Sequence, residues 1–131
     1  MSTVEEKLVI AVAANALLVA AIGARFYPMK LPATLSLESG STDLPAVTYA
    51  RLSAARHTEV PVSHPTYQMT VFGATYSQTR LAANLLVGCF TGLKSGPIRA
   101  SAVMNDHDLS DPETGLFMIP VDIKITYMEE V

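Results

Sequence analysis

The sequence TYQMTVFGATYSQTRLAANLLVGCF at residues 66–90 decides the fold, because the spacing of its apolar residues changes halfway along. Over residues 66–73 apolar and polar residues alternate, so that Tyr67, Met69 and Val71 fall on one side of an extended strand. Beyond this point the spacing becomes helical. The segment therefore predicts a strand that runs directly into a helix, as in a domain that combines both kinds of element.

The helical half of this segment begins with a capping box. Thr75 and Gln78 are three residues apart, so their side chains can bind the free N–H groups at the start of the helix. The helix is expected to end near Gly92. Its predicted buried face consists of Leu81, Ala82, Leu85 and Cys89. On that face Cys89 is interpreted as a small core residue and not as a nucleophile.

Further strands are predicted on both sides of this segment. The segments predicted as strands are AVTYARLSA (46–54), TYQMTVFG (66–73), PIRASAVMND (97–106) and GLFMIPVDIKITY (115–127). The last has the clearest alternation, and its predicted inward residues are Phe117, Ile119, Val121, Ile123, Ile125 and Tyr127. Pro120 falls in the outward register and predicts an edge strand or a bulge. The segments predicted as loops are residues 25–45 and 56–65, both rich in proline, and a polar turn before the last strand.

The run KLVIAVAANALLVAAI at residues 7–22 predicts a helix over residues 3–23. Thr3 and Glu6 form a second capping box, and the acidic flank lacks the positive charge that precedes a secretory signal. The run is also shorter than the roughly 20 residues that cross a bilayer. A sequence resembling a cleavage site, Ala-Ile-Gly-Ala, keeps secretion open as an alternative. The expected location is the cytoplasm.

These elements predict an α+β fold with the order α-β-β-α-β-β, in a single domain over residues 1–131. Two hairpins joined by a helix suggest an antiparallel four-stranded sheet with two helices packed on one face. The first helix is apolar nearly all round, so it needs cover on more than one side, which a subunit interface could supply. Half of the residues are apolar and 16% are charged, which also favours a chain that buries surface against copies of itself or a partner.

No catalytic or cofactor motif is visible in the sequence. The net charge of −3 gives no basic footprint for nucleic acid, and the single cysteine excludes an internal disulfide. His57, His64 and His107 lack the spacing of a helical zinc motif and are expected in solvated loops. We therefore expect no enzyme activity, no metal and no cofactor, with a metal-dependent hydrolase as the weakest alternative.

The ordered set of segments resembles the tail completion, or tail terminator, proteins of phages with long non-contractile tails. The segments that carry the resemblance are the alanine-rich first helix with ARFYP, then LPAVTYARLS, TYQMTVFGATYSQTRLAANLL and DPETGLFMIPVDIKITYMEE. The resemblance implies a ring, expected as a hexamer, at the head-proximal end of the tail. Such a ring stops tube polymerisation and joins the head connector. The family contributes no catalytic residues and no interface motif.

The resemblance implies three partners: further copies of the chain, the tail tube protein and the head–tail connector protein. No membrane and no specific nucleic-acid binding are expected, although DNA would pass through the ring. The protein would assemble in the host cytoplasm and end in the virion tail. The residues proposed to contact the tube or a neighbouring subunit are Tyr27, Leu31, Leu35, Arg51, Arg56 and His57. Another connector or minor tail protein, or a small non-viral ligand-binding module, fits the same layout.

Overall fold

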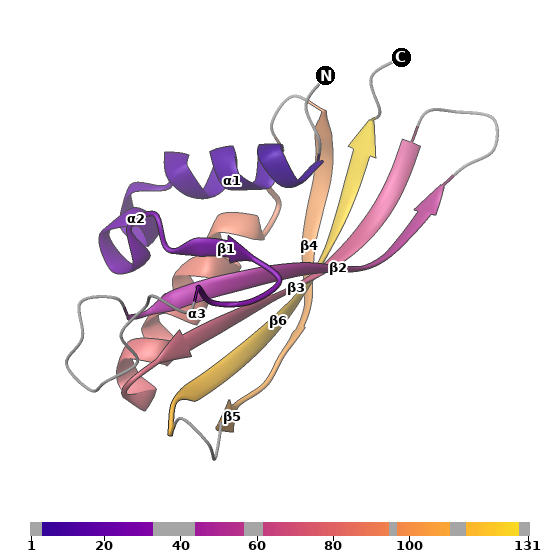
Figure 1. Cartoon of the computed structure of the whole chain (residues 1–131). Coiled ribbons are helices and arrows are strands. Elements are labelled where there is room, and N and C mark those ends of the chain that lie inside the picture. The colour runs from indigo at the N-terminus through magenta and orange to yellow at the C-terminus, as the bar shows by residue number, and fades with distance from the viewer. Residues whose placement is uncertain (1–3, 33–43, 57–61, 95–96, 111–114, 129–131) are drawn as a thin grey trace.

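The computed structural model describes residues 4–32, 44–56, 62–94, 97–110 and 115–128, with side chains for all of them except residues 53–56. The helices in this part are α1 (Val4–Ala14), α2 (Ala16–Ile22) and α3 (Tyr76–Phe90). The strands are β1 (Phe26–Pro28), β2 (Ala46–Arg56), β3 (Val62–Gly73), β4 (Ile98–Asp106), β5 (Leu109–Ser110) and β6 (Phe117–Met128). Figure 1 shows the helical layer beside a long, twisted sheet.

The six strands form one sheet in the order β1-β2-β3-β6-β4, with β5 paired to the beginning of β6. The two predicted hairpins, β2–β3 and β4–β6, are both antiparallel, and β3 pairs antiparallel with β6 between them. The prediction of an antiparallel four-stranded sheet is therefore right for the long strands and wrong in strand number. The two additional strands, β1 and β5, lie in segments predicted as loop and turn.

The first added strand, β1, runs parallel to β2 at the sheet edge. Pro28 is tolerated there because an edge strand needs no N–H on its outer side. The Phe26 ring stacks on the ring of Tyr49 with centroids 4.5 Å apart, and the Met29 N–H donates to the Tyr49 carbonyl at 2.8 Å. Contacts with a distant strand therefore hold β1, which local sequence could not reveal.

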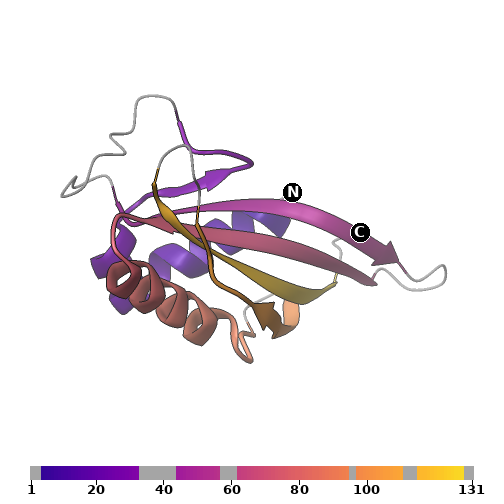
Figure 2. The same cartoon turned by 90° about the horizontal axis from the view of Figure 1, so that it is seen from below.

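All three helices lie on one side of the sheet (Figure 2). The single helix predicted over residues 3–23 is wrong, because it is broken at Asn15 into α1 and α2. Asn15 has an extended backbone (φ −91°, ψ 103°), and its side-chain oxygen accepts the Leu18 N–H at 3.1 Å. This cap begins α2 and ends α1. The predicted end at Gly23 is confirmed, with a positive φ of 60° at that residue, while Thr3 lies outside the described residues.

Helix α3 begins as predicted, because the Thr75 hydroxyl oxygen accepts the Gln78 N–H at 3.2 Å. Its predicted buried face is partly wrong, since Leu81 is 60% exposed. The residues of α3 that are buried are Thr79, Ala82, Ala83, Leu86, Cys89 and Phe90. The rotation of α3 follows from its close approach to β3, where an added Cβ on Gly73 would collide with the Thr79 hydroxyl. The interpretation of Cys89 as a core residue is confirmed.

The main core lies between the helices and the inward face of the sheet. The predicted inward positions of β3 are all buried, and those of β6 are buried except for half-buried Phe117. A smaller cluster on the other face joins Leu44, Ala46 and Leu116 to Tyr27, Leu31 and Phe72. The remaining side chains on this outer face are mostly polar and include Thr48, Thr66, Gln68, Thr70, Asp122, Lys124 and Thr126.

Two prolines occupy strands in ways that the sequence did not predict. Residues 62–65 belong to β3 and not to a loop. The pairing between β3 and β6 skips His64 and Pro65. Because Pro65 is unpaired on the β6 side, its missing N–H removes no hydrogen bond of that ladder. Pro120 lies in β6, an inner strand, and not at an edge or a bulge. It falls between the last β4 pairing, at Val121, and the first β5 pairing, at Met118.

Candidate functional site

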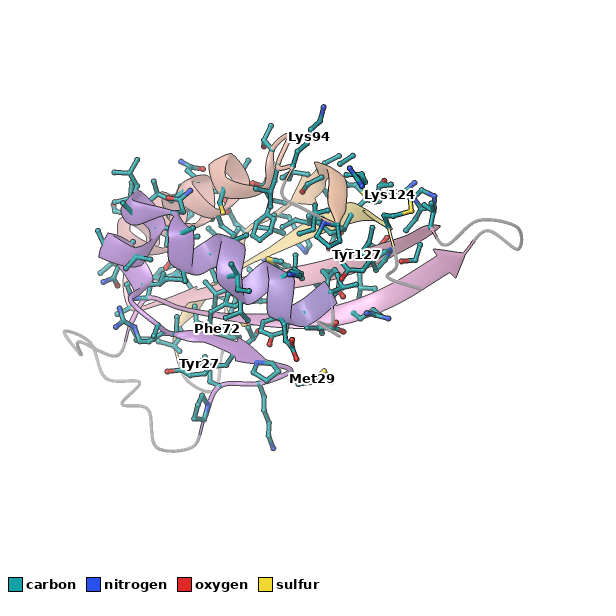
Figure 3. The ribbon with its side chains drawn as sticks, turned by 90° about the horizontal axis from the view of Figure 1, so that it is seen from above. Tyr27, Met29, Phe72, Lys94, Lys124 and Tyr127 are labelled. Carbon is teal, nitrogen blue, oxygen red and sulfur yellow. The ribbon has the colours of Figure 1, made fainter. Side chains whose placement is uncertain are left out.

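The predicted contact residues do not form one surface. Tyr27 and Leu31 are half-buried and pack on the small cluster of the outer sheet face. Arg51 lies on the opposite, helix-covered face, where it contacts Tyr67. Figure 3 shows Tyr27 near Phe72, in line with this separation. These three predicted contact residues therefore lie in two different local environments.

The other predicted contact residues are not placed in the same detail. Leu35 and His57 lie outside the described residues. Arg56 ends β2 opposite Ser63 of β3, and its side chain is among those not described. The contact role of these residues stays a prediction.

Arg51 connects α1 to the sheet. Its Nη2 donates to Glu5 Oε1 at 2.9 Å and to the Tyr67 hydroxyl at 3.0 Å, and its guanidinium lies 5.6 Å from the centroid of the Tyr67 ring. Burial raises the pKa of Tyr67 to about 12, although the hydrogen bond from Arg51 opposes this rise. Tyr67 therefore stays neutral, and the cluster fixes the first turn of α1 above β2 and β3.

A second cluster of charges connects α3 to the end of β4. Arg80 donates to Asp106 Oδ2 at 3.1 Å and to Asp108 Oδ1 at 2.6 Å, and the Tyr76 hydroxyl donates to Asp108 Oδ2 at 3.0 Å. The bond from Arg80, followed by that from Tyr76, holds the pKa of Asp108 below its usual value. Arg80 thus pairs with both carboxylates, Asp106 and Asp108. Within the described part of the chain, no group of three or more His, Cys, Asp or Glu residues could hold a metal ion.

The outward side of α1 and α2 exposes a set of apolar side chains. No charged residue occurs between Leu8 and Ala24. The exposed residues, which together we name the α1–α2 surface, are Val9, Ile10, Ala13, Ala14, Ala16, Leu17, Val19 and Ala20. Leu17 is 70% and Ile10 57% exposed. None of the described helices has the length and hydropathy to cross a membrane.

Two open grooves flank Ile10 on this surface. One, of about 400 Å³, is lined by Glu5, Glu6, Val9, Ile10 and Tyr49. The other, of about 310 Å³, lies toward the end of α3 and is lined by Ile10, Ala11, Ala14, Asn15, Cys89, Leu93 and Lys94. Both have mostly apolar walls, with carboxylates at the rim of the first and an ammonium at the rim of the second. A low content of charged residues is also found at the centres of protein–protein interfaces.

Comparison with known proteins gives a likeness to a solved structure. No protein-family model and no curated protein matches the sequence. Among solved structures, the chain is similar to a chain of the virion of a native gene transfer agent particle. The TM-score is 0.70 at 14% sequence identity, over 92% of this chain and 90% of that chain. The two chains therefore share a fold over nearly their whole lengths.

Sequence reasoning recognised that the first helix needs cover but did not choose its residues as contacts. Residues such as Ile10 and Leu17 were not named, because the contacts were placed on the long loop around Tyr27, Leu31 and Leu35 and on the 54–65 loop. The usable signal was the absence of any charge between Leu8 and Ala24, since a helix on the surface of a monomer normally carries a polar face.

Proposed function

We propose that this chain is a structural protein of a phage-like virion that closes the head-proximal end of the tail tube as a ring. The observation that carries the proposal is the fold, which the chain shares over 92% of its length with a chain of a gene transfer agent virion. The order of sequence segments that resembles tail completion proteins supports the same role.

The α1–α2 surface supports assembly. Interfaces are depleted of charged residues at their centres, and this surface exposes two helices without a single charged side chain from Leu8 to Ala24. A monomer would leave these side chains in water, whereas a ring covers one such surface per subunit. A closed ring also limits the number of copies, which is what the end of a tube requires.

The remaining partners of the proposal are the tail tube protein on one side of the ring and the head–tail connector protein on the other. The predicted contact residues Leu35, Arg56 and His57 would contact the tube or the neighbouring subunit. A different connector or minor tail protein is the closest alternative, because it would share the fold and the need for an interface but would bind another part of the particle.

The test uses purified tail tube protein that polymerises in vitro. The full-length chain is added during polymerisation, and tube lengths and tube ends are recorded by electron microscopy. The proposal predicts shorter tubes with a ring at one end only, and Leu35→Asp should reduce capping without unfolding the chain. Tubes of unchanged length with bare ends would contradict the proposal, and binding to isolated connectors alone would favour the alternative.

A further inference from the structure

We infer that α1 is exchanged between copies in the ring: the bend at Asn15 straightens, and α1 of each copy occupies on the next copy the place that it fills on its own. The inference rests on the proposed function and adds to it how the subunits are joined. Because each copy gives one α1 and receives one, the contact runs head to tail and can close into a ring. The place that α1 fills, which we name the α1 slot, is formed by Tyr49, Arg51 and Tyr67 of the sheet and Cys89 of α3.

The bend at Asn15 opposes the local preference of the chain. Residues 4–22 contain neither Gly nor Pro and are rich in Ala, so their sequence predicts one continuous helix. Instead, Asn15 is extended, and the N–H groups of Ala16 and Leu17 in the first turn of α2 have no partner in their own helix. Figure 1 shows α1 and α2 meeting at an angle. A straight helix would pair both N–H groups with carbonyls of α1. A conflict of this kind between local preference and packing is expected at functional elements.

The α1 slot holds α1 along a narrow stripe. The buried side chains of α1 form a single row with one residue per turn, Val4, Leu8 and Val12. Of the two open grooves beside Ile10, one lies between α1 and β2 and the other between α1 and the end of α3. In α2, by contrast, Leu18 and Ile22 are fully buried. α1 can therefore leave its slot while α2 stays in place.

α1 of a second copy is the occupant that the slot itself selects. Arg51 pairs with Glu5 at 2.9 Å, and Cys89 Sγ lies 3.9 Å from the Ala11 carbonyl oxygen. An identical helix reproduces both contacts and the buried row, so the exchange loses no contact of α1, while the straight helix gains backbone hydrogen bonds at the bend. The ion pair also opens at small cost, because both of its side chains are 36% exposed.

A straightened α1 has the length and the surface that such an arm needs. Its 11 residues extend about 16 Å beyond the bend, roughly half the diameter of a small domain. The exposed side chains around the bend then lie at the junction of the two copies; they are Ala13, Ala14, Ala16 and Leu17. None of them is charged, as is usual at the centre of a protein–protein interface.

A disulfide between two different chains tests the exchange, because Ala11 and Cys89 line the same groove. One chain carries Ala11→Cys with Cys89→Ala, so that its only thiol is on α1, whereas the only thiol of the wild type is in the slot. The two chains are unfolded, refolded together and oxidised with copper phenanthroline. The inference predicts a disulfide-linked dimer with one copy of each, and an α1 that stays in its own slot gives none. Ala13→Cys in the same Cys89→Ala background is the matched control and should give no such dimer, because Ala13 is exposed on the outward side of α1.

Reversed charges provide an independent readout. Glu5→Arg and Arg51→Glu each place like charges together when α1 occupies its own slot. In a mixture of the two variants, exchange restores opposite charges at every contact of a ring in which the variants alternate. With one variant labelled with ¹⁵N, native mass spectrometry should show assemblies with equal numbers of both, enriched about twofold or more over their statistical share. Lys124→Glu replaces Arg51→Glu in the control mixture, which should stay statistical, because Lys124 lies on the outer face of the sheet.

The bend itself supplies a third pair of variants. Asn15→Ala removes the cap of α2 and suits a continuous helix, whereas Asn15→Gly is tolerated as a cap and weakens a helix interior. The dissociation constant of the assembly should therefore be about tenfold lower for Asn15→Ala than for Asn15→Gly. Equal constants would overturn the straightening of the bend.

The outcomes separate this inference from the proposed function. Rings that form without the mixed disulfide and with a statistical mixture of the charge variants would overturn the exchange alone. If the charge variants do not fold, the disulfide test still decides, because it changes only alanine and cysteine. A wild-type chain that stays monomeric both alone and with tail tubes would overturn the exchange and the proposed ring together.

Discussion

Gly73→Ala tests how β3 is joined to α3. A Cβ at this position would overlap the Thr79 hydroxyl oxygen and lie 3.1 Å from the Thr79 Cβ. Thr79 is fully buried, and its hydroxyl donates to the Thr75 carbonyl at 2.7 Å, so the side chain cannot rotate away without losing that bond. The substitution must therefore either push α3 away from the sheet or break a buried hydrogen bond.

The expected cost follows from these two routes. Overpacking a core by a methyl group typically costs about 1–3 kcal/mol, and losing a buried hydrogen bond instead costs about 1 kcal/mol or more. Because the protein takes one of the two routes, we expect Gly73→Ala to lower the free energy of unfolding by about 1–3 kcal/mol, measured by urea unfolding followed by circular dichroism. That is a large share of the 5–15 kcal/mol that stabilises a typical domain.

A double-mutant cycle makes the reasoning refutable. Thr79→Ala alone should cost about 1–2 kcal/mol, because it removes the hydroxyl and one methyl group. The Thr79 hydroxyl oxygen causes the worst overlap with the added Cβ. The variant with both substitutions should therefore be no less stable than Gly73→Ala alone. Its free energy of unfolding should be close to that of Thr79→Ala. Costs that simply add, or a cost of Gly73→Ala below about 0.5 kcal/mol, would refute the proposed contact.

Three further predictions concern the helix break and the two charged clusters. Asn15→Ala removes the cap of α2 and should lower the free energy of unfolding by about 1 kcal/mol, measured by urea unfolding, with Ala16→Gly as a comparison that retains the cap; no change would mean that Asn15 does not hold the break. Because the folded pKa of Tyr67 is raised to about 12 from 10.0, stability is retained below pH 10 and lost as the pH rises toward 12. Between pH 10 and 12 the free energy of unfolding of Tyr67→Phe should fall by about 2 kcal/mol less than that of the wild type. An equal fall in the two proteins would contradict the raised pKa of Tyr67. The folded pKa of Asp108 is depressed below 3.8, so its stabilisation is present above that pH and lost as the pH falls through the folded value; Asp108→Asn should flatten the acid limb of the unfolding curve, whereas an unchanged limb would exclude this contribution.

The parts of the fold that could be predicted from the sequence are those in which local spacing reflects burial. The strand around Met69 and the helix that follows Thr75 were expected, because period two and period 3.6 follow each other within one segment. Strand β6 was equally clear, since its inward positions are apolar from Ile119 to Tyr127. In these segments, local preference and tertiary packing favour the same structure.

The parts that were missed depend on contacts between distant segments. β1 exists because Phe26 stacks on Tyr49, a residue more than twenty positions away, and three residues ending in a proline show no strand pattern of their own. The exposure of Leu81 follows from the close approach of α3 to Gly73, which fixes the rotation of the helix. A helical pattern cannot reveal which of two adjacent apolar stripes faces the sheet.

The predicted contact residues are tested by no contact in the structure, and they stay a prediction. Loops were expected to carry them, but Tyr27 and Leu31 pack locally, while the exposed apolar residues gather on α1 and α2. Sequence patterns report that a residue prefers to be buried; they do not report whether its own domain or another molecule buries it. The composition and the apolar first helix predicted assembly, but the residues exposed for it were identified only in the folded chain.

Native mass spectrometry of the full-length protein tests the central claim most directly. A closed ring of six copies of the 14.0 kDa chain predicts a dominant species of about 84 kDa, either alone or after addition of tail tubes. The same species should weaken when Leu17→Glu places a charge on the α1–α2 surface and should persist with Leu52→Glu. A monomer under all of these conditions, with tubes left uncapped, would contradict the proposal that this chain closes a tail as a ring.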